Sequence, residues 1–387
     1  MQLRSKGTMR SRVYNVLYVH PFSAISGAEL SLLGLLEKID RSVFSPRAVI
    51  SEDGDLSARL RELDVPVSIV KLDDGSRHDP WPFLRSVANM VKVIVSGGID
   101  LVHVNFERCN RPVAFASKIT LKPQICHVRN IQNEESVRHF YLKLSPYLIA
   151  NSFATEASYA PYLLKSQKSF MVYNGVDLSR FIPQKKIEGF YGVEKDAIVI
   201  AQVGRIVSGK KLDTYVKAMS RVIKSSSKKV YGLIVGDISD FKNPLIFDPE
   251  YFREIKRLIS QLGLDDRLIF TGFIKDQMKL YSNIDVLVQS SQSEGFGRTL
   301  IEAMAMGVPV VAAKAGGTEE IVKDNLTGFL FPPEDQNALA DLILNIMDNP
   351  DAGRKIAANA RKWIAGNFSI EKHFQAIEKI YRMILTG

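Results

Sequence analysis

The sequence has little cysteine and no long hydrophobic run. Its two cysteines, Cys109 and Cys126, are too few for a disulfide framework and too isolated for a zinc site, so a reducing compartment is favoured. No apolar stretch approaches the length that spans a bilayer. We therefore expect a cytoplasmic protein, either free or held at the inner face of the membrane.

The amino-terminal stretch M-Q-L-R-S-K-G-T-M-R-S-R carries four basic residues and precedes an apolar segment. It differs from a signal peptide because the apolar segment Val13–Val19 is short and His20-Pro21 interrupts it. We interpret residues 1–12 as a flexible basic arm that precedes the first strand.

Candidate metal ligands are scarce as well. Asp53 and Asp55 flank Gly54 in an Asp-x-Asp pattern, which can hold a divalent ion. The pattern follows a predicted strand and opens a predicted helix, so a turn with a helix N-cap is the favoured interpretation. We expect neither a metal ion nor another cofactor.

The chain of 387 residues exceeds the usual size of one domain, and its composition is that of an ordinary globular protein. Short apolar runs alternate with amphipathic segments of helix length, which indicates an α/β fold with parallel sheets. We predict a Rossmann-like N-terminal domain at 13–180, a linker at 181–195 and a Rossmann-like C-terminal domain at 196–368. The last segment, 369–387, is predicted to be a helix that can cross back to the first domain.

The net charge of +9 is unevenly distributed along the chain. Between residues 108 and 168, nine Lys and Arg residues stand against three Glu residues and are interleaved with seven aromatic residues. Such a zone would suit nucleic acid, anionic lipid head groups or a pyrophosphate-bearing substrate, and an ordinary solvated surface would explain it too. Nucleic acid is the least favoured partner because no recognised binding module accompanies the zone.

A glycine-rich loop followed by a predicted helix dominates the second half. The stretch from Ser293 to Glu302 reads S-E-G-F-G-R-T-L-I-E, and its glycines, Gly295 and Gly297, let the backbone bend and approach a ligand closely. The helix is expected to begin near Gly297. Its first amides belong to Arg298, Thr299 and Leu300. We expect these amides to be unpaired and to bind a phosphate group with the help of the helix dipole.

Two acids flank this helix start. Glu302 lies about one turn into the helix, and we expect it to lack a basic partner there and to accept both hydroxyls of a ribose. Glu294, in the loop, is placed to accept hydroxyls from the group beyond the phosphates. The alternative is that Glu294 caps a turn and Glu302 lies on a solvated face, but the apolar neighbours of Glu302 argue against such a face.

Basic side chains follow predicted strands, at the sheet edge where open α/β proteins bind ligands. The strand at 198–203 leads into a loop with Arg205 and Lys210, two cations that can neutralise a diphosphate without a metal. In the first half, a strand holds His127 near its end and Arg129 follows it. Surface cations and a buried core histidine are the alternatives that the sequence leaves open.

These motifs resemble the retaining glycosyltransferase family 4, which has the two-domain GT-B fold. The C-terminal resemblance is specific, because S-E-G-F-G-R-T-L-I-E is followed by A-M-A-M-G-V-P-V-V-A, G-G-T-E-E-I-V and T-G-F-L-F-P-P in order. The N-terminal resemblance is thinner. It rests on S-G-A-E from Ser26, D-L-V-H-V-N from Asp100, H-V-R-N from His127, N-S from Asn151 and N-G-V-D from Asn174. Along nearly the whole chain, the resemblance implies two Rossmann-like domains that face each other across a cleft.

The resemblance also implies an activity. It is the metal-independent transfer of a sugar, with retention of configuration, from a nucleoside-diphosphate sugar to a hydroxyl of a glycan or lipid-linked acceptor. The nucleotide is expected to be UDP in preference to GDP. Cell-surface polysaccharide or glycolipid synthesis would be the setting, and an anionic membrane surface a further partner.

Site residues carry over position by position. Glu302 would bind the ribose and Glu294 the transferred sugar, while Arg205 and Lys210 match the G-R-x-x-x-x-K element that stabilises the departing diphosphate. His127 would line the acceptor side near the anomeric carbon. The further donor contacts implied are Gly27, Phe296, Gly297, Arg298, Thr299, Leu300, Phe273 and Ile274.

The sequence departs from the family pattern at three loop positions. Ser26 stands where many relatives have glycine, Lys211 replaces the glycine after the motif lysine, and Ile238 replaces a glycine after Asp237. None of these changes removes a charged group that the mechanism needs. Two other functions remain open at this point, namely a nucleotide-sugar 2-epimerase of the same architecture and a catalytically silent partner subunit.

Overall fold

The computed structural model describes residues 12–76, 78–238 and 247–386, which form two compact units. The first unit comprises the described chain up to Asn151, Glu156–Val172 and the chain from Phe374 on. The second unit comprises Ser152–Thr155 and Tyr173–His373. The basic arm expected at residues 1–12 lies outside the described residues, apart from Arg12.

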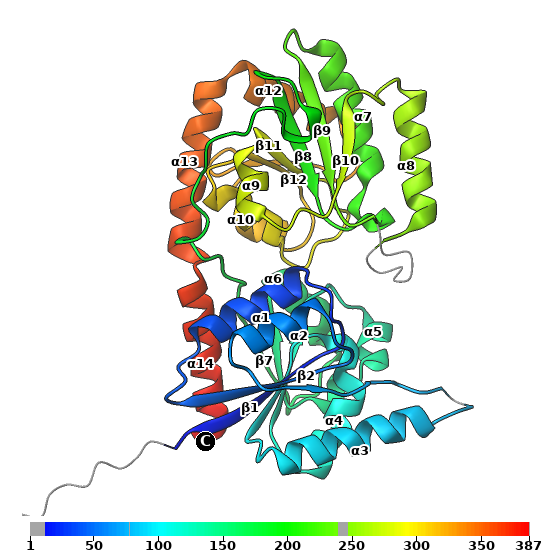
Figure 1. The fold of residues 1–387 in the computed structure, drawn as a ribbon, viewed down its shortest axis with the longest axis vertical. Helices are drawn as coiled ribbons and strands as arrows, with labels where there is room; N and C mark the ends of the chain where they lie inside the picture. The colour runs from blue at the N-terminus through cyan, green and yellow to red at the C-terminus, as the bar shows by residue number, and fades with distance from the viewer. Residues whose placement is uncertain (1–11, 77, 239–246, 387) are drawn as a thin grey trace, which may run out of the picture. The chain divides into compact units, whose positions relative to one another are not determined.

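The first unit is built on a parallel seven-stranded sheet in the order β3-β2-β1-β4-β5-β6-β7 (Figure 1). Its strands are β1 (Tyr14–His20), β2 (Phe44–Ile50), β3 (Val67–Ile69), β4 (Leu101–Val104), β5 (Gln124–Val128), β6 (Tyr147–Ala150) and β7 (Lys168–Met171). Every pairing between neighbouring strands is parallel. The order reverses beside β1, which is the doubly wound pattern.

Helices cover both faces of this sheet because alternate strand residues are apolar on both sides. One face packs against α1 (Gly27–Lys38), α2 (Asp55–Glu62) and α14 (Ile370–Thr386). The other packs against α3 (Trp81–Ser96), α4 (Asn110–Ile119), α5 (Glu134–His139) and α6 (Phe153–Tyr159). In β1, for example, Val16 and Tyr18 face the first group while Leu17 and Val19 face the second.

The second unit repeats the plan with a parallel six-stranded sheet in the order β10-β9-β8-β11-β12-β13. Its strands are β8 (Ile198–Val203), β9 (Val230–Val235), β10 (Leu268–Gly272), β11 (Val286–Gln289), β12 (Val310–Ala313) and β13 (Phe329–Phe331). One face packs against α9 (Gln277–Ser282), α10 (Arg298–Ala305), α11 (Thr318–Ile321) and α13 (Pro350–Asn367). The other packs against α7 (Leu212–Ser225), α8 (Pro249–Gln261) and α12 (Gln336–Asp348).

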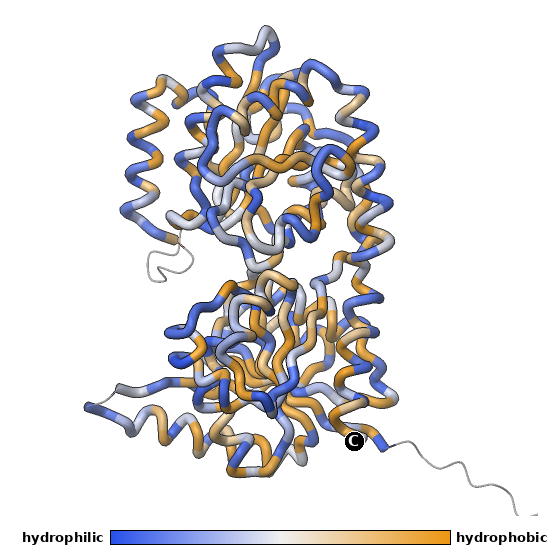
Figure 2. The backbone as a smooth tube through the Cα atoms, turned by 180° about the vertical axis from the view of Figure 1, so that it is seen from behind, coloured by the Kyte–Doolittle hydropathy of each residue, from blue (hydrophilic) through white to orange (hydrophobic). Residues whose placement is uncertain are grey.

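The predicted α/β class with two doubly wound sheets is confirmed. In Figure 2 the apolar segments of the tube gather toward the middle of each unit, as expected for sheets covered on both faces. The stretch 181–195, expected as a linker, lies in the second unit and buries Phe190 and Val193 in its core. No helix among the described residues is both long and apolar enough to cross a membrane.

Candidate functional site

The loop before α10 lies at the carboxyl edge of the second sheet, and two glycines hold its backbone. The amide of Gly317 donates to the carbonyl oxygen of Glu294 at 2.9 Å. A Cβ on Gly316 would lie 2.4 Å from that oxygen, and one on Gly317 would lie 2.6 Å from the carbonyl oxygen of Gly295. Any larger residue would therefore displace the loop. The sequence motif G-G-T-E-E-I-V contained this pair, but its packing role was not predicted.

The start of α10 is formed by Gly297, whose φ of 108° is in the region that favours glycine. The amides of Arg298 and Thr299 have no acceptor among the described residues and are available to a ligand. The amide of Leu300, expected to be unpaired, donates instead to the carbonyl oxygen of Gly297 at 3.1 Å. The prediction was wrong for Leu300 because the first turn is closed by a hydrogen bond between residues three positions apart, as in a 3₁₀-helix.

Glu302 is 3% exposed and both of its carboxylate oxygens have partners. Arg298 Nη2 lies 2.8 Å from Oε1, and the Tyr281 hydroxyl donates to Oε2 at 3.0 Å. The expectation that Glu302 lacks a basic partner was therefore wrong, since Arg298 precedes it by one helical turn. These two donors orient the carboxylate and leave each oxygen with a further lone pair for a ligand hydroxyl. Burial, followed by the charge of Glu302, raises the pKa of Tyr281.

The structure brings Lys210 and Glu294 together. Lys210 Nζ lies 2.6 Å from Glu294 Oε2, and the side chains are 19% and 17% exposed. Gln289 Nε2, at the end of β11, donates to the same oxygen at 3.1 Å. Glu294 Oε1 has no protein donor within the described ranges, so it is the oxygen that can accept a ligand hydroxyl. Arg205 lies earlier on the same loop as Lys210 and its side chain is exposed.

The loop that carries Lys210 is fixed through its own backbone. The carbonyl oxygen of Lys210 accepts from Gln202 Nε2 at 2.8 Å and from the Ser290 hydroxyl at 3.0 Å. Lys211 follows with a φ of 49°, in the left-handed region, and its ammonium group lies 3.1 Å from a carboxylate oxygen of Glu334. Lysine thus adopts here the backbone conformation that suits the glycine it replaces in the family pattern.

Three residues that were expected to contact the sugar donor differ in whether their side chains are exposed. Phe296 is 2% exposed, and its ring centroid lies 5.9 Å from that of Tyr173 and 5.9 Å from that of Phe368. Ile274 also packs into the core of the second unit. Only their main-chain atoms can therefore meet a ligand. Phe273, by contrast, is 49% exposed after the end of β10.

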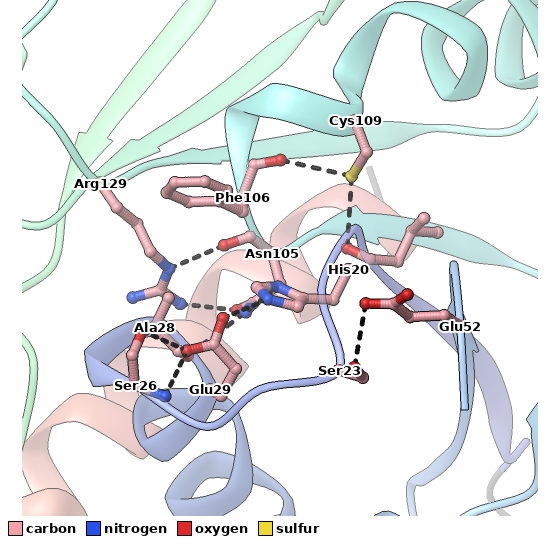
Figure 3. Close-up of polar contacts among 11 residues, drawn as sticks. His20, Ser23, Ser26, Ala28, Glu29, Glu52, Asn105, Phe106, Cys109 and Arg129 are labelled. Carbon is pink, nitrogen blue, oxygen red and sulfur yellow. Dashed lines mark hydrogen bonds and ion pairs between the residues drawn. The ribbon is translucent and has the colours of Figure 1, made fainter. Parts of the chain in front are cut away.

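In the first unit, His127 and Arg129 are buried at the carboxyl end of β5. The His127 ring is stacked on His103 with 5.6 Å between centroids. Arg129 Nε donates to the carbonyl oxygen of Asn105 at 2.7 Å, and Nη2 donates to Asn105 Oδ1 at 2.6 Å (Figure 3). Arg129 is therefore not one of the surface cations of the basic zone. Gly27 is exposed at the start of α1.

Other members of the basic zone also serve the fold. The Arg111 guanidinium lies 4.5 Å from the ring centroid of Phe83 and 4.8 Å from that of Tyr141, so this cation packs between two aromatic rings.

In the Asp-x-Asp stretch, the Asp53 carboxylate accepts from Ser57 and Arg61. No group of three or more His, Cys, Asp and Glu side chains suited to a metal occurs in the described part of the chain.

The comparisons with known proteins find similar glycosyltransferases. Residues 183–363 match the family Glycosyl transferases group 1. N-acetyl-alpha-D-glucosaminyl L-malate synthase of Bacillus anthracis is 24% identical over 318 residues, which cover 78% of this chain and 79% of that protein. D-inositol 3-phosphate glycosyltransferase of Kribbella flavida is 33% identical over 228 residues, which cover 57% of this chain and 52% of that protein.

Solved structures match over nearly the whole length. Anabaena Alr3699/HepE in complex with UDP and glucose has a TM-score of 0.82 at 25% identity, covering 95% of this chain and 98% of the other. Sucrose-phosphate synthase of Thermosynechococcus elongatus, at 20% identity and a TM-score of 0.80, shares the fold, with 96% of this chain and 99% of that chain covered. The chain is thus a glycosyltransferase with a GT-B fold that is similar to family 4, and its residues 183–363 match the family Glycosyl transferases group 1.

Proposed function

We propose that the chain transfers a sugar from a nucleoside-diphosphate sugar to a hydroxyl of a glycan or lipid-linked acceptor, with retention of configuration and without a metal. The observation that carries this proposal is the Lys210–Glu294 pair at the start of α10. The pair provides a fixed cation and a carboxylate oxygen for a sugar hydroxyl. The neighbouring amides of Arg298 and Thr299 suit a phosphate group.

UDP is the proposed nucleotide. In support, HepE, which is 25% identical to this chain, has been solved with UDP and with UDP-glucose. Glu302 is oriented by Arg298 and Tyr281 to accept ribose hydroxyls, which would place the diphosphate at the start of the same helix. A hexose is the proposed transferred group.

The charges of the second unit suit the departure of a diphosphate. Negative charge develops on the leaving group as the glycosidic bond breaks, and Lys210, Arg205 and the start of α10 are preorganised to stabilise it. Lys210 and Gln289 hold Glu294 through Oε2, and we assign the other oxygen, Oε1, to a hydroxyl of the sugar and not to covalent attack. We therefore favour attack of the acceptor on the face from which the diphosphate leaves, with the diphosphate as the base.

The acceptor is proposed to be presented near a membrane in polysaccharide or glycolipid synthesis. Relatives include a lipopolysaccharide core mannosyltransferase of Rhizobium meliloti, 28% identical over 237 residues, which cover 60% of this chain and 65% of that protein. Helices α3 and α4 pack together, and large apolar side chains there and just after α4 are exposed, among them Trp81 at 72% and Leu121 at 90%. Arg85 and Lys118, also exposed, add positive charge on the same two helices. This combination suits an anionic lipid surface.

A donor screen with chelator controls tests the proposal. Binding of UDP, GDP and ADP is compared by thermal shift, and the sugars of the preferred nucleotide are then assayed for transfer by NMR, which reports the anomeric configuration. Retention and full activity in EDTA are expected. An inverted product would contradict retention, a loss of activity in EDTA would contradict metal independence, and turnover to an epimer without acceptor would show a 2-epimerase.

A separate experiment tests the proposed membrane contact. Vesicles of phosphatidylglycerol at low salt should bind the chain.

A further inference from the structure

Gln289 is a buried polar residue at the last position of β11, beside the carboxylate of Glu294. It is 6% exposed, and its backbone is held in the second sheet, where it pairs with Ala312 of β12. Its Nε2 donates to Glu294 Oε2 at 3.1 Å. Because only the amide nitrogen can donate to a carboxylate, the amide oxygen Oε1 is the atom that faces the start of α10. A Cβ on Gly297 would lie 3.4 Å from it.

The amide oxygen of Gln289 is buried and has no hydrogen-bond donor among the residues that the structure describes. A buried acceptor without a donor destabilises a folded protein, and an apolar side chain of similar length would avoid this destabilisation. The stability of the second unit therefore does not account for a glutamine at this position. What the glutamine provides is the hydrogen bond from its amide nitrogen to Glu294.

This hydrogen bond differs in rigidity from the contact that Lys210 makes with the same oxygen. Lys210 Nζ lies 2.6 Å from Glu294 Oε2, but it is carried by a flexible four-carbon side chain. Gln289 reaches that oxygen from a paired strand. The main-chain carbonyl oxygen of Glu294 is held by the Gly317 amide at 2.9 Å. Gln289 is thus the rigid partner that sets how the carboxylate is rotated.

The residue after Gln289 fixes the other member of the ion pair. Ser290 is fully buried, and its hydroxyl lies 3.0 Å from the main-chain carbonyl oxygen of Lys210 and 2.8 Å from that of Lys211. The end of β11 therefore holds the loop of Lys210 through Ser290 and the side chain of Glu294 through Gln289. All of these residues belong to the second unit.

We propose that Gln289 is a positioning residue for the transferred sugar. It holds Glu294 by Oε2, so that Oε1 faces the sugar hydroxyl that the proposed function assigns to it. The inference rests on that function, because it needs Glu294 to contact the sugar. Without the amide of Gln289, the carboxylate would be free to turn and to engage Lys210 with both oxygens. The sugar would then lose its acceptor, while the contacts of the nucleotide would stay in place.

Gln289→Met tests the inference, because methionine has a similar length and lacks the amide. The matched control is Thr327→Val. Thr327 is 3% exposed in the turn before β13, at the opposite edge of the same sheet, and its hydroxyl accepts from the Lys323 amide at 2.9 Å. Both variants thus remove one buried polar group from the second unit, but only the first group contacts Glu294.

The affinities for UDP-glucose and for UDP are measured by titration calorimetry, and thermal unfolding is followed in parallel. Gln289→Met should weaken UDP-glucose binding by about tenfold and leave UDP binding within about twofold of wild type. Its melting temperature should not fall, because the unpartnered oxygen is removed together with the amide nitrogen. Thr327→Val should lose thermal stability and bind both ligands as wild type does.

Four outcomes overturn the inference. Three concern affinity, namely unchanged UDP-glucose binding in Gln289→Met, an equal loss for UDP-glucose and UDP, and the same UDP-glucose loss in the control. The fourth is a melting temperature that falls as far in Gln289→Met as in the control, which would show that Gln289 serves the fold.

A third variant, Glu294→Ala, separates failure of the inference from failure of the proposed function. If Glu294→Ala does not weaken UDP-glucose binding relative to UDP binding, the sugar contact of Glu294 is itself wrong. A loss in Glu294→Ala without a loss in Gln289→Met removes only the role of Gln289. A wild-type protein that binds neither ligand would overturn both.

Discussion

Lys210 Nζ lies 2.6 Å from Glu294 Oε2, although 84 residues separate the two in the chain. The contact joins the loop after β8 to the loop after β11, two neighbouring strands of the second sheet. Both side chains are mostly buried, so solvent screens the pair less than it would a surface ion pair. The contact holds Glu294, which carries the only carboxylate of the loop between β11 and α10, near the first amides of α10.

Replacing Lys210 by Ala should lower kcat by about 10²- to 10³-fold, because a preorganised cation at the leaving group is lost. Steady-state kinetics with the donor found by the screen measures the effect. Lys211→Ala is the matched control, since it removes a neighbouring cation whose partner is Glu334. Equal activity of both variants would contradict the role of Lys210.

Tyr281→Phe should raise the donor KM by about tenfold and change kcat little. The variant removes the hydroxyl that donates to Glu302 Oε2 at 3.0 Å, and a hydrogen bond to a charged group contributes roughly 1.5–3 kcal/mol. Tyr215→Phe is the control, because Tyr215 is buried in the same unit and donates to the Ile200 carbonyl oxygen at 2.8 Å. If Tyr215→Phe raised the KM equally, the effect would be one of stability.

Lys211→Gly should be more stable than Lys211→Ala. Both variants lose the contact with Glu334. Only glycine adopts the φ of 49° at this position without strain, whereas any other residue loses about 1 kcal/mol of stability in that conformation. Thermal unfolding should place the glycine variant about 2 °C above the alanine variant. The reverse order would show that the left-handed backbone at this position is not strained.

Glu29 should make the first unit sensitive to acid. Burial favours the neutral acid, but the positive charge of protonated His20, followed by the hydrogen bonds from His20 and Ser26, outweighs it and lowers the pKa of Glu29 from 4.5 to about 2. Because the folded-state pKa lies below the unfolded one, the stabilisation is complete above about pH 4.5 and is lost as the pH falls towards 2. It corresponds to ~3 kcal/mol.

Urea titrations at several pH values between 2 and 6, followed by circular dichroism, test this expectation. The free energy of unfolding of wild type should fall relative to that of Glu29→Gln as the solution is acidified. A difference between the two proteins that stays constant over this range would contradict the lowered pKa.

Much of the fold follows from the sequence because apolar strand runs and amphipathic helices are local signals. The strands at 198–203 and 230–235, for example, contain only buried or half-buried residues on both faces. Contacts between distant residues leave no such signal. The sequence placed Lys210 and Glu294 among the candidates but could not show that they touch.

Two buried polar residues show where local patterns fall short. His20 ends the apolar run in the sequence but still completes β1, one residue beyond the apolar segment, because Glu29 and Asn105 satisfy its ring nitrogens inside the unit. Glu302 was thought to lack a basic partner, although Arg298 at the four-residue spacing was a signal in the sequence itself. A polar residue at a strand end with an acid in the next helix start is the pattern that would have indicated the His20–Glu29 pair.

The division of α14 between the units bears on how the chain folds during synthesis. Ile377 and Tyr381, both fully buried, belong to the core that also contains β1, which is made some 360 residues earlier. The first unit can therefore complete its core only after α14 has left the ribosome, whereas nearly all of the second unit precedes that helix in the chain. A chain that stops before Phe374 would expose the apolar face of β1 and should require a chaperone or aggregate.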